Sequence, residues 1–125
     1  MRSRVLDVGN CDADHALIRD MLVRHFDVEV ERVMFVDEAI SAMKKTHYQL
    51  VLVNRLIFDD GSPGIELLRR AKADTTIADA SVMMVSNYAQ AQAASVAAGG
   101  VPGFGKSALN QPDTISTLSA YLPVK

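Results

Sequence analysis

The chain has 125 residues and a formal net charge of −2, with 49% hydrophobic and 22% charged residues. This composition excludes a disordered chain and predicts a single globular domain over residues 1–125. The near balance of 13 basic and 15 acidic residues disfavours nucleic acid and anionic membrane surfaces as partners.

The sequence also bears on the cell compartment. It contains no apolar run long enough to span a membrane, and its first ten residues lack the apolar centre of a signal peptide. The single cysteine, Cys11, excludes an internal disulfide and a cysteine-rich zinc site. We therefore expect a protein of the reducing cytoplasm.

Short apolar runs alternate with stretches of helical periodicity along the chain. Leu50–Val53 and Val82–Val85 are unbroken apolar runs, as expected of strands covered by helices on both faces. The other expected strands are Val5–Val8, Val28–Val33 and, more weakly, Val101–Phe104.

Between these strands, apolar residues spaced three and four apart predict five helices. Asp12 is the expected N-cap of the first helix, Gly99-Gly100 ends the fourth, and Pro112 lies near the first turn of the last. In chain order the apolar stripes are Leu17–Phe26, Val36–Met43, Ile65–Ala71, Ala89–Ala98 and Ile115–Leu122.

The strand–helix order, repeated five times, predicts an α/β fold in which a doubly wound parallel sheet is covered by helices on both faces. Binding sites in such sheets form beyond the carboxyl ends of the strands. The residues that follow the expected strands are Gly9-Asn10, Asn54-Arg55, Ser86-Asn87 and Lys106.

Several segments resemble the receiver domain of two-component response regulators (the CheY-like family), in the same order and over nearly all 125 residues. They are Tyr48–Asn54 followed by Gly64–Leu68, the second-helix segment Asp37–Ile40, the strand Val82–Val85 ending at Ser86, and Gly103–Lys106. The resemblance implies the flavodoxin-like (βα)₅ topology with strand order 2-1-3-4-5.

In that family an acidic pair and an acceptor aspartate bind Mg²⁺, and the aspartate takes a phosphoryl group from a histidine kinase. The acidic pair falls here on Gly9 and Asn10, and the acceptor falls on Asn54; only Ser86 and Lys106 keep the family chemistry. An amide is a poor nucleophile, and protein Mg²⁺ sites usually include carboxylates. We therefore expect a degenerate phosphorylation pocket with no Mg²⁺, no other cofactor and no catalytic residue.

Other roles for this pocket stay open at the level of sequence. Lys106, Ser86 and Arg55 could bind a small anion, or Asp59 or Asp60 of the long loop Arg55–Gly64 could pair with Lys106. A further alternative is phosphorylation at Asp12, Asp59 or Asp60. The stretch Gly100–Ser107 matches the G-x-x-x-x-G-K-S phosphate-loop pattern, but a helix rather than a strand precedes it.

Polar residues elsewhere receive simpler interpretations. Asp7 lies inside the first expected strand, where we expect a salt bridge with a nearby basic group or partial exposure. His15 and His25 are expected at the surface. Cys11 is expected to be an ordinary loop cysteine.

The resemblance implies a non-enzymatic, phosphorylation-independent module for protein interaction in two-component signalling. The resemblance implies that the partner is a signalling protein or an output domain. It would bind the face made by the fourth helix, fifth strand and fifth helix, which are expected at Tyr88–Ala98, Val101–Phe104 and Pro112–Leu122. A homodimer is also compatible with the family pattern.

Overall fold

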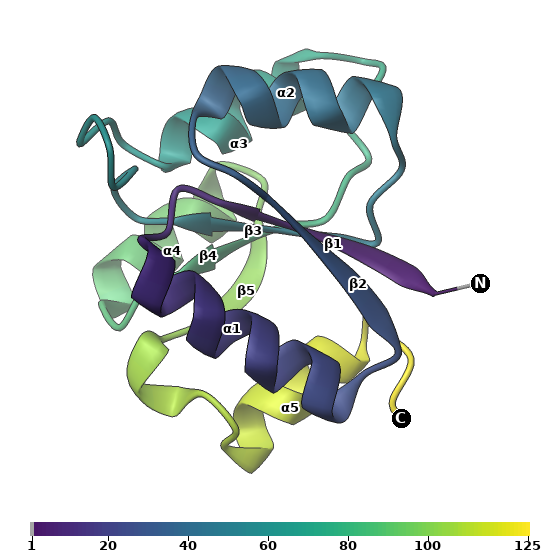
Figure 1. The fold of residues 1–125 in the computed structure, drawn as a ribbon. Helices are drawn as coiled ribbons and strands as arrows, with labels where there is room; N and C mark the ends of the chain where they lie inside the picture. Colours follow the sequence, from purple (N-terminus) through teal and green to yellow (C-terminus); the bar gives the residue numbers. More distant parts are fainter. Residues whose placement is uncertain (1) are drawn as a thin grey trace.

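The computed structural model describes residues 2–125 and contains a five-stranded parallel sheet in the order β2-β1-β3-β4-β5 (Figure 1). The predicted α/β fold and strand order are thus confirmed. In chain order the elements are β1 (Ser3–Val8), α1 (Asp12–His25), β2 (Val28–Val33), α2 (Val36–Lys45), β3 (Leu50–Asn54), α3 (Ile65–Ala73), β4 (Val82–Val85), α4 (Ala89–Ala97), β5 (Val101–Phe104), the short 3₁₀ turn η1 (Lys106–Ala108) and α5 (Pro112–Ser119).

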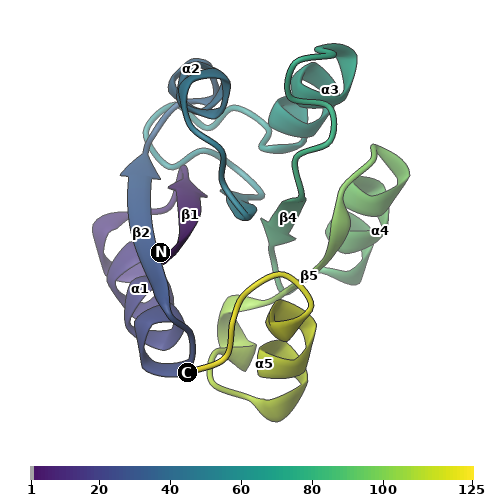
Figure 2. The ribbon, with the colours of Figure 1, turned by 90° about the vertical axis from the view of Figure 1, so that its right-hand side faces the viewer.

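Helices cover both faces of the sheet, and each face has its own apolar core (Figures 1 and 2). One core joins α2 and α3 to the sheet, with α4 at its edge, and contains Val51, Val53 and Met84. The other joins α1 and α5 to the sheet. Its members alternate with those of the first along the central strands, as Leu50 and Leu52 do in β3. This alternation explains why the run Leu50–Val53 is apolar throughout.

The start of α1 differs from the prediction. Cys11 is the N-cap and Asp12 is the first helical residue, so the expected capping role of Asp12 is wrong. Leu17, expected in the apolar stripe, is 57% exposed, because the buried side of α1 is centred on Ile18 and Leu22. One residue corresponds to about 100° around a helix, which turns Leu17 towards solvent.

The predicted end of the fourth helix is confirmed. Gly99 has φ +102°, and the N–H groups of Gly99 and Gly100 donate to the carbonyls of Val96 and Ser95. The chain then continues directly into β5, so Val101–Phe104, half of the stretch that matched a phosphate loop, is a strand. Such a loop would have to follow a strand rather than be one, so this pattern carries no phosphate-binding geometry.

Within the described part of the chain, none of the helices has both the length and the apolar character needed to traverse a bilayer.

Candidate functional site

The carboxyl ends of β3, β4 and β5 meet at a cavity of about 200 Å³. Because all five strands are parallel, the residues that follow them gather at one edge of the sheet. Four of the predicted site residues line this cavity, namely Asn54, Arg55, Ser86 and Lys106. Gly9 and Asn10, which follow β1, do not line it.

Lys106, at the start of η1, forms an ion pair with a residue of α1. Its Nζ donates to Oδ2 of Asp14 at 2.7 Å, and both side chains are about one-third exposed. This bond holds the pKa of Asp14 below its usual 3.8. Asp60 bonds to Ser62, and neither Asp59 nor Asp60 forms an ion pair with Lys106, so the alternative in which one of them does is wrong.

The Asn54 amide is engaged by the backbone of the following loop. Its Nδ2 donates to the Leu56 carbonyl at 2.6 Å and lies 3.5 Å from the Gly9 carbonyl. The side chain therefore ties the end of β3 to the loop that leaves it. An amide in this position can orient backbone but has no oxyanion with which to attack phosphorus.

Residues after β4 make their own local contacts. The Ser86 hydroxyl accepts the Tyr88 N–H at 3.1 Å, and Asn87 Oδ1 accepts both the N–H and the hydroxyl of Ser107 at 3.0 Å. The Arg55 guanidinium lies 4.9 Å from the centroid of the exposed Tyr88 ring. Among the described residues, no hydrogen bond uses the Ser86 hydroxyl proton or the Arg55 guanidinium, so both remain available as donors.

The loop between β3 and α3 folds back over the end of β1. The Phe58 N–H donates to the Gly9 carbonyl at 2.9 Å, and the fully buried Ile57 side chain packs against Gly9. Gly9 has φ +79°, and a Cβ added there would overlap Ile57 Cδ1. The space beside the first family acid position is therefore filled by aliphatic carbon.

The Asn10 side chain points into the protein and forms a hydrogen bond with a buried carboxylate. Its Nδ2 donates to Oδ1 of Asp7 at 2.6 Å, while Oδ2 of Asp7 lies 2.7 Å from Nδ1 of His15. Asp7 is fully buried, so partial exposure is wrong, and the nearby basic group expected as its partner is His15. The surface location expected for His15 is also wrong, because its side chain is only 17% exposed.

The site therefore contains two cations, Lys106 and Arg55, among neutral amides and a hydroxyl, and Lys106 is bonded to the carboxylate of Asp14. Among residues 2–125, no three side chains of His, Cys, Asp or Glu lie close enough together to hold a metal ion. Gly9, Asn10 and Asn54 stand at the three positions where the family has acids. They can provide only neutral oxygen ligands, which bind Mg²⁺ weakly.

Sequence reasoning missed Asp14, His15 and Ile57. The first two lie in the first helical turn after β1, and that turn adjoins the same sheet edge as the site. An inspection of helical first turns would have found them as candidate partners. No local pattern marks Ile57, because an isoleucine in a long loop has no characteristic spacing.

The chain matches no protein-family model and no curated protein sequence. Its structure is nevertheless similar to many solved ones. A sensor protein from Polaromonas sp. JS666 superimposes with a TM-score of 0.81 at 18% identity, covering 97% of this chain and 96% of that chain.

The chain has the receiver-domain fold. The signal receiver domain of an HD domain-containing protein from Pseudomonas fluorescens Pf-5 gives a TM-score of 0.78 at 13% identity, covering 97% of this chain and 87% of that one. The chemotaxis response regulator CheY4 of Vibrio cholerae gives 0.69 at 15% identity, covering 98% and 100%. At such identities the likeness to these receivers is one of fold.

Proposed function

We propose that this chain is a degenerate receiver: a single, non-enzymatic domain of cytoplasmic two-component signalling that binds a protein partner without being phosphorylated. The observation that carries the proposal is the position of Ile57. Its buried aliphatic side chain lies against Gly9, where phosphorylated receivers hold a carboxylate and a hydrated Mg²⁺. An acidic side chain at position 9 would overlap Ile57, so the space of the first family acid is already filled.

The ion pair of Lys106 supports the same proposal. In a phosphorylated receiver the lysine contacts the phosphoryl oxygens, whereas here Asp14 of the same chain occupies its Nζ at 2.7 Å. Two of the three alternative acceptors also have other partners, since Asp12 pairs with Arg32 and Asp60 bonds to Ser62, whereas Asp59 forms no ion pair with any described residue. We therefore favour the degenerate receiver over an atypical phosphorylation site or an anion sensor.

The proposed partner surface is the face of α4, β5 and α5. Residues 82–105, which include α4 and β5, contain no charged side chain, and α5 contains only Asp113. Ala93, Val96 and Tyr88 are exposed on this face. Protein interfaces are depleted of charge at their centres, so this composition suits a protein partner or a second copy of the chain.

Intact mass spectrometry tests the first half of the proposal. The protein is incubated with acetyl phosphate, with and without Mg²⁺, alongside a receiver that keeps the acceptor aspartate. We expect the mass of one phosphoryl group to be added to the control only. A Mg²⁺-dependent adduct on this chain would overturn the proposal, and peptide mapping would identify the acid that accepts it.

Substitution on the face tests the second half. Ala93→Glu places a charge at the exposed surface of α4, and Ala16→Glu does the same on α1 as the matched control. The tagged variants are compared with the wild type by quantitative mass spectrometry of the proteins they retain from native cells. We expect Ala93→Glu to lose a partner that Ala16→Glu keeps; equal retention by both would contradict this choice of face.

A further inference from the structure

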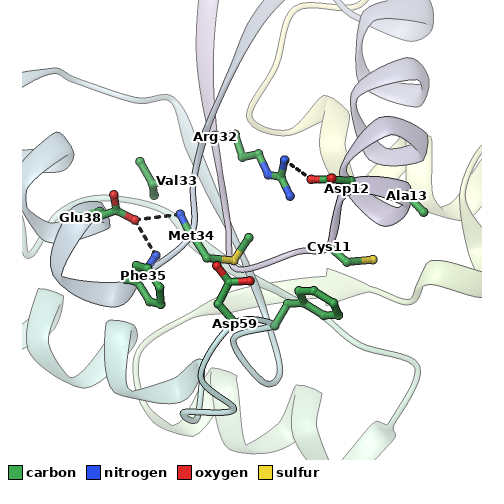
Figure 3. A pocket seen from close by; sticks show the side chains of 10 residues that line it. Cys11, Asp12, Ala13, Arg32, Val33, Met34, Phe35, Glu38 and Asp59 are labelled. Atoms are coloured by element: carbon green, nitrogen blue, oxygen red, sulfur yellow. Dashed lines mark hydrogen bonds and ion pairs between the residues drawn. The ribbon is translucent and has the colours of Figure 1, made fainter.

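A cleft of about 650 Å³ lies apart from the degenerate pocket, among the loops that follow β1, β2 and β3 (Figure 3). We call it the loop cleft. It lies between the start of α1, the end of β2 with Arg32 and the following connection with Met34, and the long loop after β3 with Phe58 and Asp59. Volumes of this size accommodate several side chains of a bound molecule.

Two aromatic residues of the loop cleft are exposed. Phe58 is 64% exposed and Phe35 is 39% exposed, and the Met34 side chain points towards Asp59 in Figure 3. Exposed aromatic and methionine side chains are enriched where proteins bind one another. The Phe58 backbone is itself anchored, since its N–H donates to the Gly9 carbonyl, so the ring is presented from a tethered loop.

The remaining free charge in the cleft is negative. Arg32 is engaged by Asp12 and by the Asn10 carbonyl, both at 2.7 Å, so its positive charge is paired inside the chain. Asp59, in contrast, forms no ion pair with any described residue. Together with Glu38, it leaves the cleft with an uncompensated negative charge.

The polar groups that could recognise a small ligand are largely used within the chain. Oε1 of Glu38 accepts the N–H groups of Met34 and Phe35 at 3.1 and 2.9 Å. Nη1 and Nη2 of Arg32 are bonded as described, and its buried Nε is the donor left without a partner among the described residues. Small-molecule sites need converging, unsatisfied polar groups to fix orientation. What the cleft offers instead is apolar surface beside acidic charge, which complements a basic side chain flanked by apolar ones.

We propose that the loop cleft binds a segment of a partner protein in which an arginine or lysine stands next to bulky apolar residues. The basic side chain pairs with Asp59, and the apolar neighbours pack on Phe58, Met34 and Phe35. No residue of α4, β5 or α5 lines the cleft. The inference therefore goes beyond the proposed function, and either one can fail alone.

Selection from a displayed library of random peptides tests the proposal. The library is first depleted on the double variant Phe58→Ser/Asp59→Lys and then selected on the wild-type protein. Both side chains are exposed, and circular dichroism checks that the variant folds. We expect enriched peptides with Arg or Lys beside Phe or Leu, and fluorescence anisotropy should show at least tenfold weaker binding to Asp59→Lys.

Charge exchange makes the test specific. A peptide whose basic residue is replaced by glutamate should bind Asp59→Lys better than the wild type. The matched control is Asp79→Lys at the exposed connection between α3 and β4, which should leave all affinities unchanged. The proposal is overturned if no peptide is enriched, if the enriched peptides are acidic, or if Asp59→Lys binds them as well as the wild type. Sedimentation showing a dimer that Phe58→Ser abolishes would assign the cleft to a second copy and overturn it too.

Discussion

Oδ2 of Asp7 lies 2.7 Å from Nδ1 of His15, joining a fully buried carboxylate in β1 to the first turn of α1. Asn10 donates to the other carboxylate oxygen at 2.6 Å. A carboxylate without such partners would be very costly in an apolar core. The pair therefore fixes how the helix begins at the edge of the sheet that contains the degenerate pocket.

Removing the His15 imidazole should destabilise the folded state. We expect His15→Ala to lower the free energy of unfolding by about 3 kcal/mol, because Asp7 would stay buried with one partner fewer. The double variant Asp7→Val/His15→Ala should be more stable than His15→Ala. Urea denaturation measures both, and His25→Ala, whose bond to Asn110 is exposed, should cost about 1 kcal/mol or less. Equal losses for His15→Ala and His25→Ala would contradict the assigned role.

The contact between Gly9 and Ile57 predicts a coupled pair of substitutions. Gly9→Ala should cost about 2–4 kcal/mol, from its positive φ and from overlap with Ile57. In an Ile57→Ala background the same change should cost about 1–2 kcal/mol, since only backbone strain remains.

Gly61 offers the matched control for this pair. It has φ +69° and open space around the position of a Cβ, so Gly61→Ala should show the strain cost alone. Thermal and urea unfolding of the variants would measure these costs. Strict additivity of the changes at Gly9 and Ile57 would mean that Ile57 does not fill the space beside the first family acid position.

The ion pair of Asp14 and Lys106 predicts a dependence of stability on pH. Because the pKa of Asp14 is lowered in the folded state, the stabilisation is present above its usual value of 3.8 and is lost as the pH falls through the lowered value. Lys106→Met should therefore reduce stability by about 1 kcal/mol or less at neutral pH, since both groups are partly exposed. The difference should shrink towards zero in acid.

Unfolding curves recorded from neutral to acidic pH measure whether the stability difference between Lys106→Met and the wild type shrinks in acid. Lys45→Met, which removes an exposed lysine from the end of α2, is the control and should show no such trend. A difference between Lys106→Met and the wild type that grew in acid would show that Lys106 stabilises the fold by some means other than pairing with Asp14.

The side chain of Gln92 connects α4 to strands β4 and β5 by hydrogen bonds. Its Nε2 donates to the Met84 carbonyl at 2.8 Å, and its Oε1 accepts the Gly103 N–H at 3.0 Å, beside the irregular register between β4 and β5. We expect Gln92→Leu to speed hydrogen exchange at Gly103 about tenfold, equivalent to ~1.4 kcal/mol. Gln90→Leu, on the exposed side of α4, should leave that amide unchanged. Equal exchange in both variants would mean that Gln92 does not restrain the proposed partner face.

The sequence by itself determined the order of the elements and the location of the pocket. The run Val82–Val85 is apolar because both faces of the sheet are covered, and its bounds were predicted to the residue. The predicted run Leu50–Val53 ends one residue before β3 does, and the predicted run Val5–Val8 begins two residues after β1 does, because polar residues extend both strands. Parallel strands bring their carboxyl ends to one edge, so Asn54, Ser86 and Lys106 could be expected together. The first residue of a helix was harder to predict. Nothing in the local sequence decides whether Cys11 or Asp12 is the N-cap of α1, because either residue can adopt extended or helical backbone.

Only the tertiary structure decided which side chains satisfy one another at that edge. Lys106 pairs with Asp14, 92 residues away in the chain, rather than with either aspartate of the nearer loop. Asp7 pairs with His15, and Ile57 turns inward to cover Gly9. Such partners depend on where a helix begins over the sheet and how a loop folds back. Both are set by packing between distant segments, so no local periodicity records them.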